Sequence, residues 1–203
     1  MGGLLVFANA ADHPLPRLSI ILTRQTRGPF SGSHPIVGPS EEGREAGEKK
    51  KQIAERHTVR FRFWSQLLER AKARTKLHST ISPGQYHWLG TGAGRRGLSL
   101  NYVLWEHEAA AELYIDRGKD AVVENKAISD ALAASRVEID GAFGGPLEWE
   151  RLDNRRASRI RASVNTGGWK DDEATWPAIQ DETIDAMVRL EHALRPRIDN
   201  LKS

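Results

Sequence analysis

The fold is decided by two consecutive stretches, Leu98-Ser-Leu-Asn-Tyr-Val-Leu-Trp105 and Ala109-Ala-Ala-Glu-Leu-Tyr-Ile-Asp116. In both stretches apolar side chains recur at every second position, and successive side chains of a strand point to opposite faces. A tight polar connection separates the two stretches. We therefore predict two neighbouring strands, each with one buried face.

A third strand is predicted before this pair, over Gln85–Thr91, and the glycine-rich segment Gly90–Gly97 leads from it into the next strand. Further upstream, Ser82-Pro83-Gly84 interrupts the chain. The segment before this break predicts a helix that begins at Thr58, a good N-cap residue, and runs to about Arg74. Its apolar positions share one face of a helix: Phe61, Trp64, Leu67, Leu68 and Ala71.

Downstream of the central pair, the pattern predicts a helix that begins near Asp120 and ends at Gly144-Gly145-Pro146. Its buried stripe consists of Ile128, Leu132, Ser135, Ile139 and Phe143. Leu147–Leu152 and Ala157–Val164 then predict a hairpin that turns through Asp153-Asn154.

The last predicted helix begins near Thr175, with Pro177 in its first turn, where a missing N–H group costs nothing. Pro196 is expected to kink or end this helix. The order is α-β-β-β-α-β-β-α. It predicts an α/β fold of the α+β kind, with a mostly antiparallel five-stranded sheet flanked by helices.

Residues 1–57 differ from the rest of the chain. They contain five of the nine prolines and no tryptophan or tyrosine, and too little apolar material to offset the entropy of ordering. We predict a flexible leader over residues 1–57, which we also consider as the remnant of a missing upstream domain. Residues 58–203 are predicted to form a single globular α/β domain.

Composition excludes several classes of protein. The chain has no cysteine, which removes disulfides, thiolate catalysis and cysteine-containing zinc sites. The absence of cysteine also fits a reducing cytoplasm, where we expect the protein, and no apolar run approaches the length of a membrane helix, so we expect no membrane partner. The predicted domain carries 22 Lys/Arg against 21 Asp/Glu, so its overall charge indicates no particular partner.

Several motifs in this order resemble the bacterial family catalogued as domain of unknown function 4268. The matching segments are Phe63-Trp64, Trp88 with the following glycines, Ala111–Ile115, Ile139–Gly144, Leu147–Glu150, Ala157–Ile160 and Trp176. The resemblance covers roughly residues 60–200. It implies no activity, because the family has none assigned. It implies a context, since such domains resemble the C-terminal part of proteins whose N-terminal part is similar to restriction-type nucleases.

The order α-β-β-β-α-β is also that of the restriction-endonuclease-like core, so we considered a degenerate PD-(D/E)xK-like site. Such enzymes place an acid on the second strand and an acid-x-Lys on the third, which together bind Mg²⁺. Here the third strand offers Glu112-Leu113-Tyr114, with tyrosine in place of lysine, and the second strand offers Asn101.

A rearranged site would need groups from elsewhere. Lys126 or Lys119 would replace the missing lysine, and Glu108 or Asp116 would supply the second acid. The weak catalytic candidates are therefore Glu112, Glu108 and Lys126. Mg²⁺ is the only cofactor considered, and only under this alternative. No histidine spacing indicates a metal site.

The last hairpin carries a basic cluster. Its five arginines are Arg151, Arg155, Arg156, Arg159 and Arg161. Arg159 and Arg161 project from one strand face, where guanidinium groups are suited to contact phosphates. Alternatively, the face is solvated and its arginines pair with Glu148, Glu150 and Asp153 of the same hairpin.

Three functional hypotheses remain open at this point. The leading one is a non-catalytic accessory or interaction module of a nuclease or phage-defence type of protein, with nucleic acid or a nuclease-like domain as its partner. The second is the Mg²⁺-dependent nuclease with a rearranged site. The third is a structural domain that forms homodimers through the apolar stripe of the last helix.

Overall fold

The computed structural model describes residues 41–201, and this range forms four α-helices, one short 3-10 helix and five strands. Their bounds are α1 Glu41–Ala71, β1 Trp88–Gly92, β2 Leu98–Leu104, β3 Ala109–Ile115, α2 Val122–Ala133, α3 Arg136–Phe143, β4 Glu148–Glu150, β5 Ser158–Val164, η1 Glu173–Thr175 and α4 Trp176–Asp199. The first forty residues of the predicted leader lie outside the described residues.

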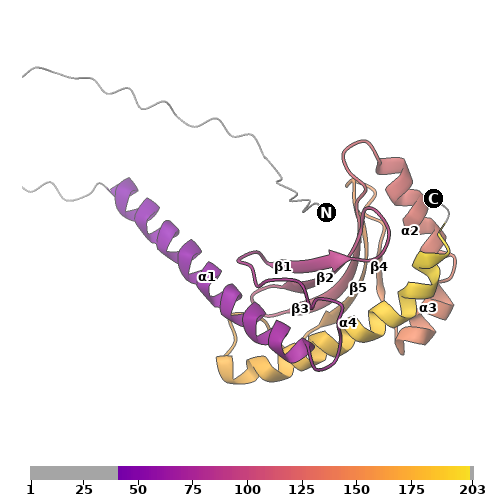
Figure 1. The fold of residues 1–203 in the computed structure, drawn as a ribbon. Coiled ribbons are helices and arrows are strands. Elements are labelled where there is room, and N and C mark those ends of the chain that lie inside the picture. The colour runs from indigo at the N-terminus through magenta and orange to yellow at the C-terminus, as the bar shows by residue number, and fades with distance from the viewer. Residues whose placement is uncertain (1–40, 202–203) are drawn as a thin grey trace, which may run out of the picture. The chain divides into compact units, whose positions relative to one another are not determined.

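The five strands form one sheet in the order β1-β2-β3-β5-β4, and each pair of neighbours is antiparallel (Figure 1). This confirms the predicted α+β fold and its antiparallel five-stranded sheet. β5 inserts between β3 and β4, so the short strand β4 forms an outer edge. β4 pairs only with Arg159–Arg161, while β5 continues to Val164.

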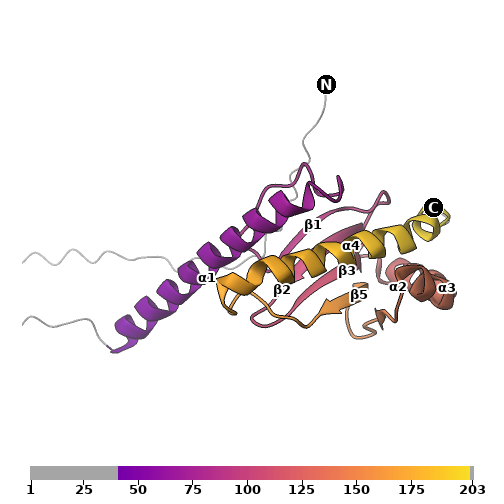
Figure 2. The same cartoon turned by 90° about the horizontal axis from the view of Figure 1, so that it is seen from below.

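One face of the sheet holds the hydrophobic core. The alternating residues of β2 and β3 that include Leu100, Leu104 and Leu113 are fully buried there. Helix α4 crosses this face over β2, β3 and β5, and it contacts α1 and α3 in turn (Figures 1 and 2). Because α4 buries its apolar stripe against the sheet, that stripe belongs to the domain's own core.

Three helix predictions need correction. α1 begins at Glu41, so the last part of the predicted leader, residues 41–57, is helical. Thr58 is therefore not an N-cap, and its Oγ1 donates to the carbonyl of Ala54 within the helix, 3.0 Å away. The segment before Thr58 lacks an apolar stripe but is rich in good helix formers, and Glu41 and Glu42 suit the helix N-terminus.

The helix predicted from Asp120 to Phe143 is divided into α2 and α3, with Ala134 and Ser135 between them. Gly144 ends α3 in the left-handed conformation, as a glycine after a helix does. Pro196 does not end α4, which continues to Asp199. No helix in residues 41–201 is long and apolar enough to cross a membrane.

Candidate functional site

The face of the sheet opposite the core, which we call the polar face, carries most of the side chains singled out in the sequence. Residues directly opposite each other in antiparallel strands project from the same face. The strand register therefore gives three rows across the sheet. The rows are Trp88, Val103, Ala110 and Ser163; Gly90, Asn101, Glu112, Arg161 and Glu148; and Gly92, Ser99, Tyr114, Arg159 and Glu150.

Glu112 lies in the middle row and is almost completely buried, with 5% of its surface exposed. Asn101 Nδ2 donates to its Oε1 over 3.4 Å, and Arg159 Nη1 lies 3.7 Å from its Oε2. Burial raises the pKa of Glu112, which Asn101 and Arg159 partly oppose. Gly90 is required beside it, because a Cβ atom there would collide with the side chain of Asn101.

The three weak catalytic candidates do not share a site. Glu108 pairs with Arg161 and accepts a hydrogen bond from Ser163, whereas Glu112 faces Asn101 and Arg159. The ammonium group of Lys126 makes all its hydrogen bonds to the β4–β5 turn and to Ser158. Within residues 41–201, no group of three acidic or histidine side chains is arranged to hold a metal ion.

The raised pKa of Glu112 predicts a pH dependence of stability. A carboxyl group with a raised pKa binds protons more tightly in the folded state, so its contribution to stability is lost as pH rises through that pKa. Glu112→Gln removes this loss. We expect urea unfolding to show the variant gaining stability relative to the wild type as pH rises above about 4, the pKa of an unperturbed glutamate. If the stabilities of the wild type and of Glu112→Gln changed with pH in the same way, this would contradict the burial of an ionisable Glu112.

Four of the five hairpin arginines are held by carboxylates. Arg151 pairs with Asp130 and Asp153, and Arg156 pairs with Asp116. On the polar face, the guanidinium group of Arg159 forms two hydrogen bonds to Glu150, of 2.9 and 3.0 Å. Arg161 pairs with Glu108 and Glu148, and it stacks over the ring of Trp105, 4.5 Å from its centroid.

Arg155 differs from the other four arginines. It is exposed, and no hydrogen bond or ion pair of its side chain is found in the described part of the chain. The turn that carries it is fixed by Lys126, whose Nζ donates to the carbonyls of Arg151, Leu152 and Ala157 over 2.5–3.0 Å. Of the five arginines predicted to contact nucleic acid, Arg155 is thus the one without an ion pair among the described residues, and it lies in the β4–β5 turn.

Two further cations lie at the same end of the sheet as Arg155. In the register, Leu98 is opposite Ile115, and Ile115 is opposite Ser158, so the β1–β2 loop, the β3–α2 loop and the β4–β5 turn are neighbours. Arg96 and Lys119 are exposed on the first two of these segments. Neither side chain has an ion pair within residues 41–201.

Contacts between these loops fix them together. The amide of Asp116 donates to the carbonyl of Gly97 over 2.7 Å, and the Asp116 carboxylate pairs with Arg156. Asn125 of α2 accepts from the amide of Arg117 and donates to the carbonyl of Arg156. We call Arg96, Lys119 and Arg155 the basic end of the sheet. Arg96 was not predicted to lie beside the hairpin, and Lys119 was considered only as a catalytic group.

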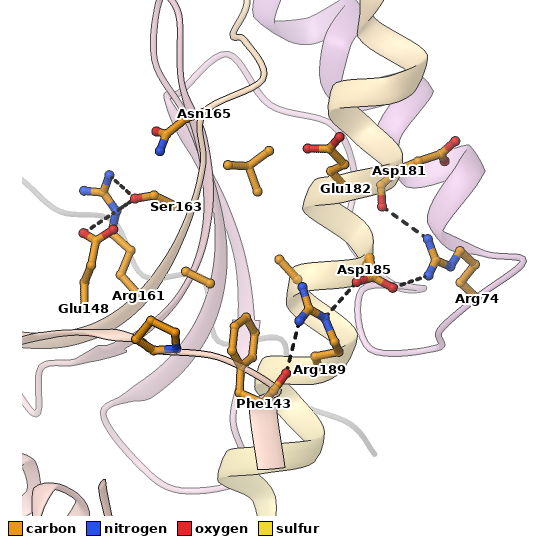
Figure 3. A pocket seen from close by; sticks show the side chains of 14 residues that line it. Arg74, Phe143, Glu148, Arg161, Ser163, Asn165, Asp181, Glu182, Asp185 and Arg189 are labelled. Carbon is orange, nitrogen blue, oxygen red and sulfur yellow. Dashed lines mark hydrogen bonds and ion pairs between the residues drawn. The ribbon is translucent and has the colours of Figure 1, made fainter. Parts of the chain in front are cut away.

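A cleft of about 630 Å³ lies between β5 and α4 (Figure 3). Arg74 and Arg189 share the carboxylate of Asp185 at 2.8 Å each, and Arg189 also donates to the carbonyl of Phe143. On the opposite wall, Arg161 is engaged as described above. Every arginine of this cleft is bound by a neighbouring group, so the cleft offers no free cation to a ligand.

Comparisons with known proteins give one match. A family model described as a domain of unknown function, DUF4268, matches residues 59–198. This agrees with the segments quoted from the sequence and with the range over which they occur. Searches of curated proteins and of solved structures found no match.

Proposed function

Because the chain belongs to the DUF4268 family, whose description assigns no activity, we propose its function from its surface: a non-catalytic accessory module that contacts nucleic-acid phosphates through the basic end of the sheet. The resemblance noted in the sequence further suggests that the module serves a nuclease or phage-defence type of protein. One observation carries the proposal, namely that Arg96, Lys119 and Arg155 are exposed on three separate segments that lie at the same end of the sheet.

These three residues are better placed to bind phosphate than the strand arginines, because their charges are not already paired with carboxylates of the described residues. Binding a phosphate with Arg159 or Arg161 would first break an ion pair that already exists, whereas Arg155 has no such pair to lose. Phosphate contacts supply the sequence-independent part of nucleic-acid affinity and make it salt-dependent. The basic end is therefore proposed to hold the sugar–phosphate backbone without reading the bases.

The alternatives receive less support. A rearranged nuclease site would require Lys126 or Glu108 to reach Glu112, and both are engaged elsewhere. A homodimer through the last helix would have to use a surface other than its apolar stripe, because that stripe packs on the sheet. Dimerisation through another surface stays a prediction.

The test is a variant in which Arg96, Lys119 and Arg155 are all replaced by alanine. We expect its affinity for a single-stranded DNA oligonucleotide to fall by about tenfold or more, as measured by fluorescence anisotropy at low salt. The slope of log affinity against log salt concentration should fall by about 2, since each phosphate contact on a single strand contributes roughly 0.7.

The matched control replaces Arg44, Lys50 and Lys76, three exposed cations away from the basic end that form no ion pair in the described residues. Its net charge changes by the same amount, so equal losses in both variants would attribute binding to overall charge and overturn the proposal. Each reaction is repeated with Mg²⁺. Cleavage that disappears in Glu112→Gln would replace the proposal by the nuclease alternative.

A further inference from the structure

A second cleft lies at the opposite end of the sheet from the basic end. It has a volume of about 590 Å³ and is formed by α1 and by the segments that contain Glu106 and Trp169. Backbone hydrogen bonds fix these two segments to each other, since the amide of Trp169 donates to the carbonyl of Trp105 and the amide of Lys170 to that of Glu106. The volume is that of a site for a small molecule.

The wall formed by α1 carries excess positive charge. Arg56 and Arg60 lie one turn apart on the same side of the helix, where like charges repel each other. No ion pair of either arginine is found among residues 41–201, and the nearby Glu55 is paired with Lys51. The carboxylate that faces them, Glu106, is already bound by Lys170 over 2.8 Å. Glu55 and Glu106 both line the cleft and each is already paired with a lysine, so Arg56 and Lys49 of the lining have no carboxylate partner within residues 41–201.

Arg60 is the most constrained of these cations. Its guanidinium group lies over the ring of Trp169, 5.6 Å from the centroid, and Lys170 Nζ lies 5.7 Å from the same centroid. Burial lowers the pKa of Arg60, the neighbouring Arg56 lowers it further, and Glu106 acts in the opposite direction. A negative charge beside Arg56 and Arg60 would relieve this repulsion.

Two hydrogen-bond donors at the cleft are without partners. Arg60 Nε and Trp169 Nε1 are both buried, and neither donates a hydrogen bond to a group within residues 41–201. Buried donors in folded proteins are nearly always satisfied, and an unpaired one calls for an acceptor. Both groups are donors only, so an acceptor that reached them would have to be an oxygen atom with lone pairs, as in an anion.

We infer that this cleft binds the phosphate group of a small molecule, with Arg56 and Lys170 as cations that line it and Arg60, against the ring of Trp169, as a third cation nearby. Phosphate fits better than a single carboxylate because it carries more charge and more acceptor oxygens for the same volume. Ile53 and Val59 line the rest of the cleft and provide an apolar wall for the group that carries the phosphate. This inference does not depend on the proposed function, because the basic end lies at the other end of the sheet.

The indole N–H resonance of Trp169 reports on this site directly. The chain has six tryptophans, and the resonance of Trp169 is assigned by its loss in Trp169→Phe. The full chain is titrated with inorganic phosphate and, separately, with adenosine monophosphate, at constant ionic strength kept with sodium chloride. We expect a saturable shift of this resonance below roughly 10 mM ligand.

The variants Arg56→Gln and Arg60→Gln should each weaken binding by about tenfold. Lys76→Gln, which removes an exposed cation elsewhere, should leave it unchanged, and so should the triple variant of the basic end. Arg56 is partly exposed, so its variant is expected to fold even if Arg60→Gln does not. Thermal unfolding of each variant checks this.

Tighter binding of the nucleotide would identify a phosphate ester as the ligand, and equal binding would identify the free anion. The absence of a saturable shift with both ligands would overturn the inference. A shift that persists unchanged in Arg56→Gln would do the same, because it would place the anion elsewhere.

Discussion

Lys126→Met is expected to lower the free energy of unfolding by about 3–5 kcal/mol. Lys126 is 7% exposed, and its ammonium group donates to three carbonyls, those of Arg151, Leu152 and Ala157, and to Ser158 Oγ. Methionine has a similar length but no donor, so these acceptors lose their shared partner. Leu152 also adopts a positive φ of 54°, which the surrounding contacts must maintain.

The matched control is Lys119→Met, which makes the same chemical change at an exposed side chain seven positions earlier. Surface substitutions of this kind change stability by about 0.5 kcal/mol or less. Urea unfolding followed by tryptophan fluorescence measures both variants. A loss below about 1 kcal/mol in Lys126→Met would show that its hydrogen bonds do not hold the turn. A loosened turn would also displace Arg155, so nucleic-acid affinity should fall with stability.

The sheet was predictable because its signal is local. In Leu98–Leu104 and Ala109–Ile115 apolar residues recur at every second position, and the structure reproduces both strands to within one residue. The early part of α1 was not predictable from periodicity, because it buries almost nothing and therefore has no apolar stripe. This part is helical because its residues favour the helical conformation and because it continues directly into the later part of α1, which packs on the rest of the domain.

The roles of charged residues were harder to predict, because they depend on contacts between distant segments. Lys126 was considered as a catalytic group, and its actual partners lie 25 to 32 positions later in the chain. Arg159 and Arg161 were correctly placed on one strand face, and Glu148 and Glu150 were considered as their partners, but nothing in the sequence showed that Glu112 of β3 also flanks them in register. The alternative prediction, in which the arginines of this face pair with carboxylates of their own hairpin, describes both Arg159 and Arg161.

The basic end was within reach of the sequence. Once three antiparallel strands are predicted, the loop that follows the first strand and the loop that follows the third lie at the same end of the sheet. Arg96 and Lys119 could then have been grouped with each other. Grouping them with Arg155 also required knowing which strand of the last hairpin lies beside β3. In the structure that strand is β5. Periodicity does not decide that choice.

Gly168→Ala is expected to lower the free energy of unfolding by about 2–4 kcal/mol. A Cβ atom at this position would collide with the carbonyl oxygen of Trp105 and lie 2.6 Å from the carbonyl carbon and oxygen of Glu106. All these atoms belong to the backbone, so no rotation of a side chain relieves the contact. The two segments would have to separate, which would break the bonds that Trp169 and Lys170 donate across them.

The control for this variant is Gly141→Ala in α3, where a Cβ atom meets nothing within 4 Å. Alanine inside a helix should raise stability by about 0.5–1 kcal/mol, so the two glycine variants are expected to differ in sign. Urea unfolding decides between them, and a neutral Gly168→Ala would show that the two segments are free to separate. Since the same segments position Trp169 and Lys170, phosphate binding should weaken in Gly168→Ala and remain unchanged in Gly141→Ala. This outcome would connect the close backbone contact at Gly168 to the cleft that it builds.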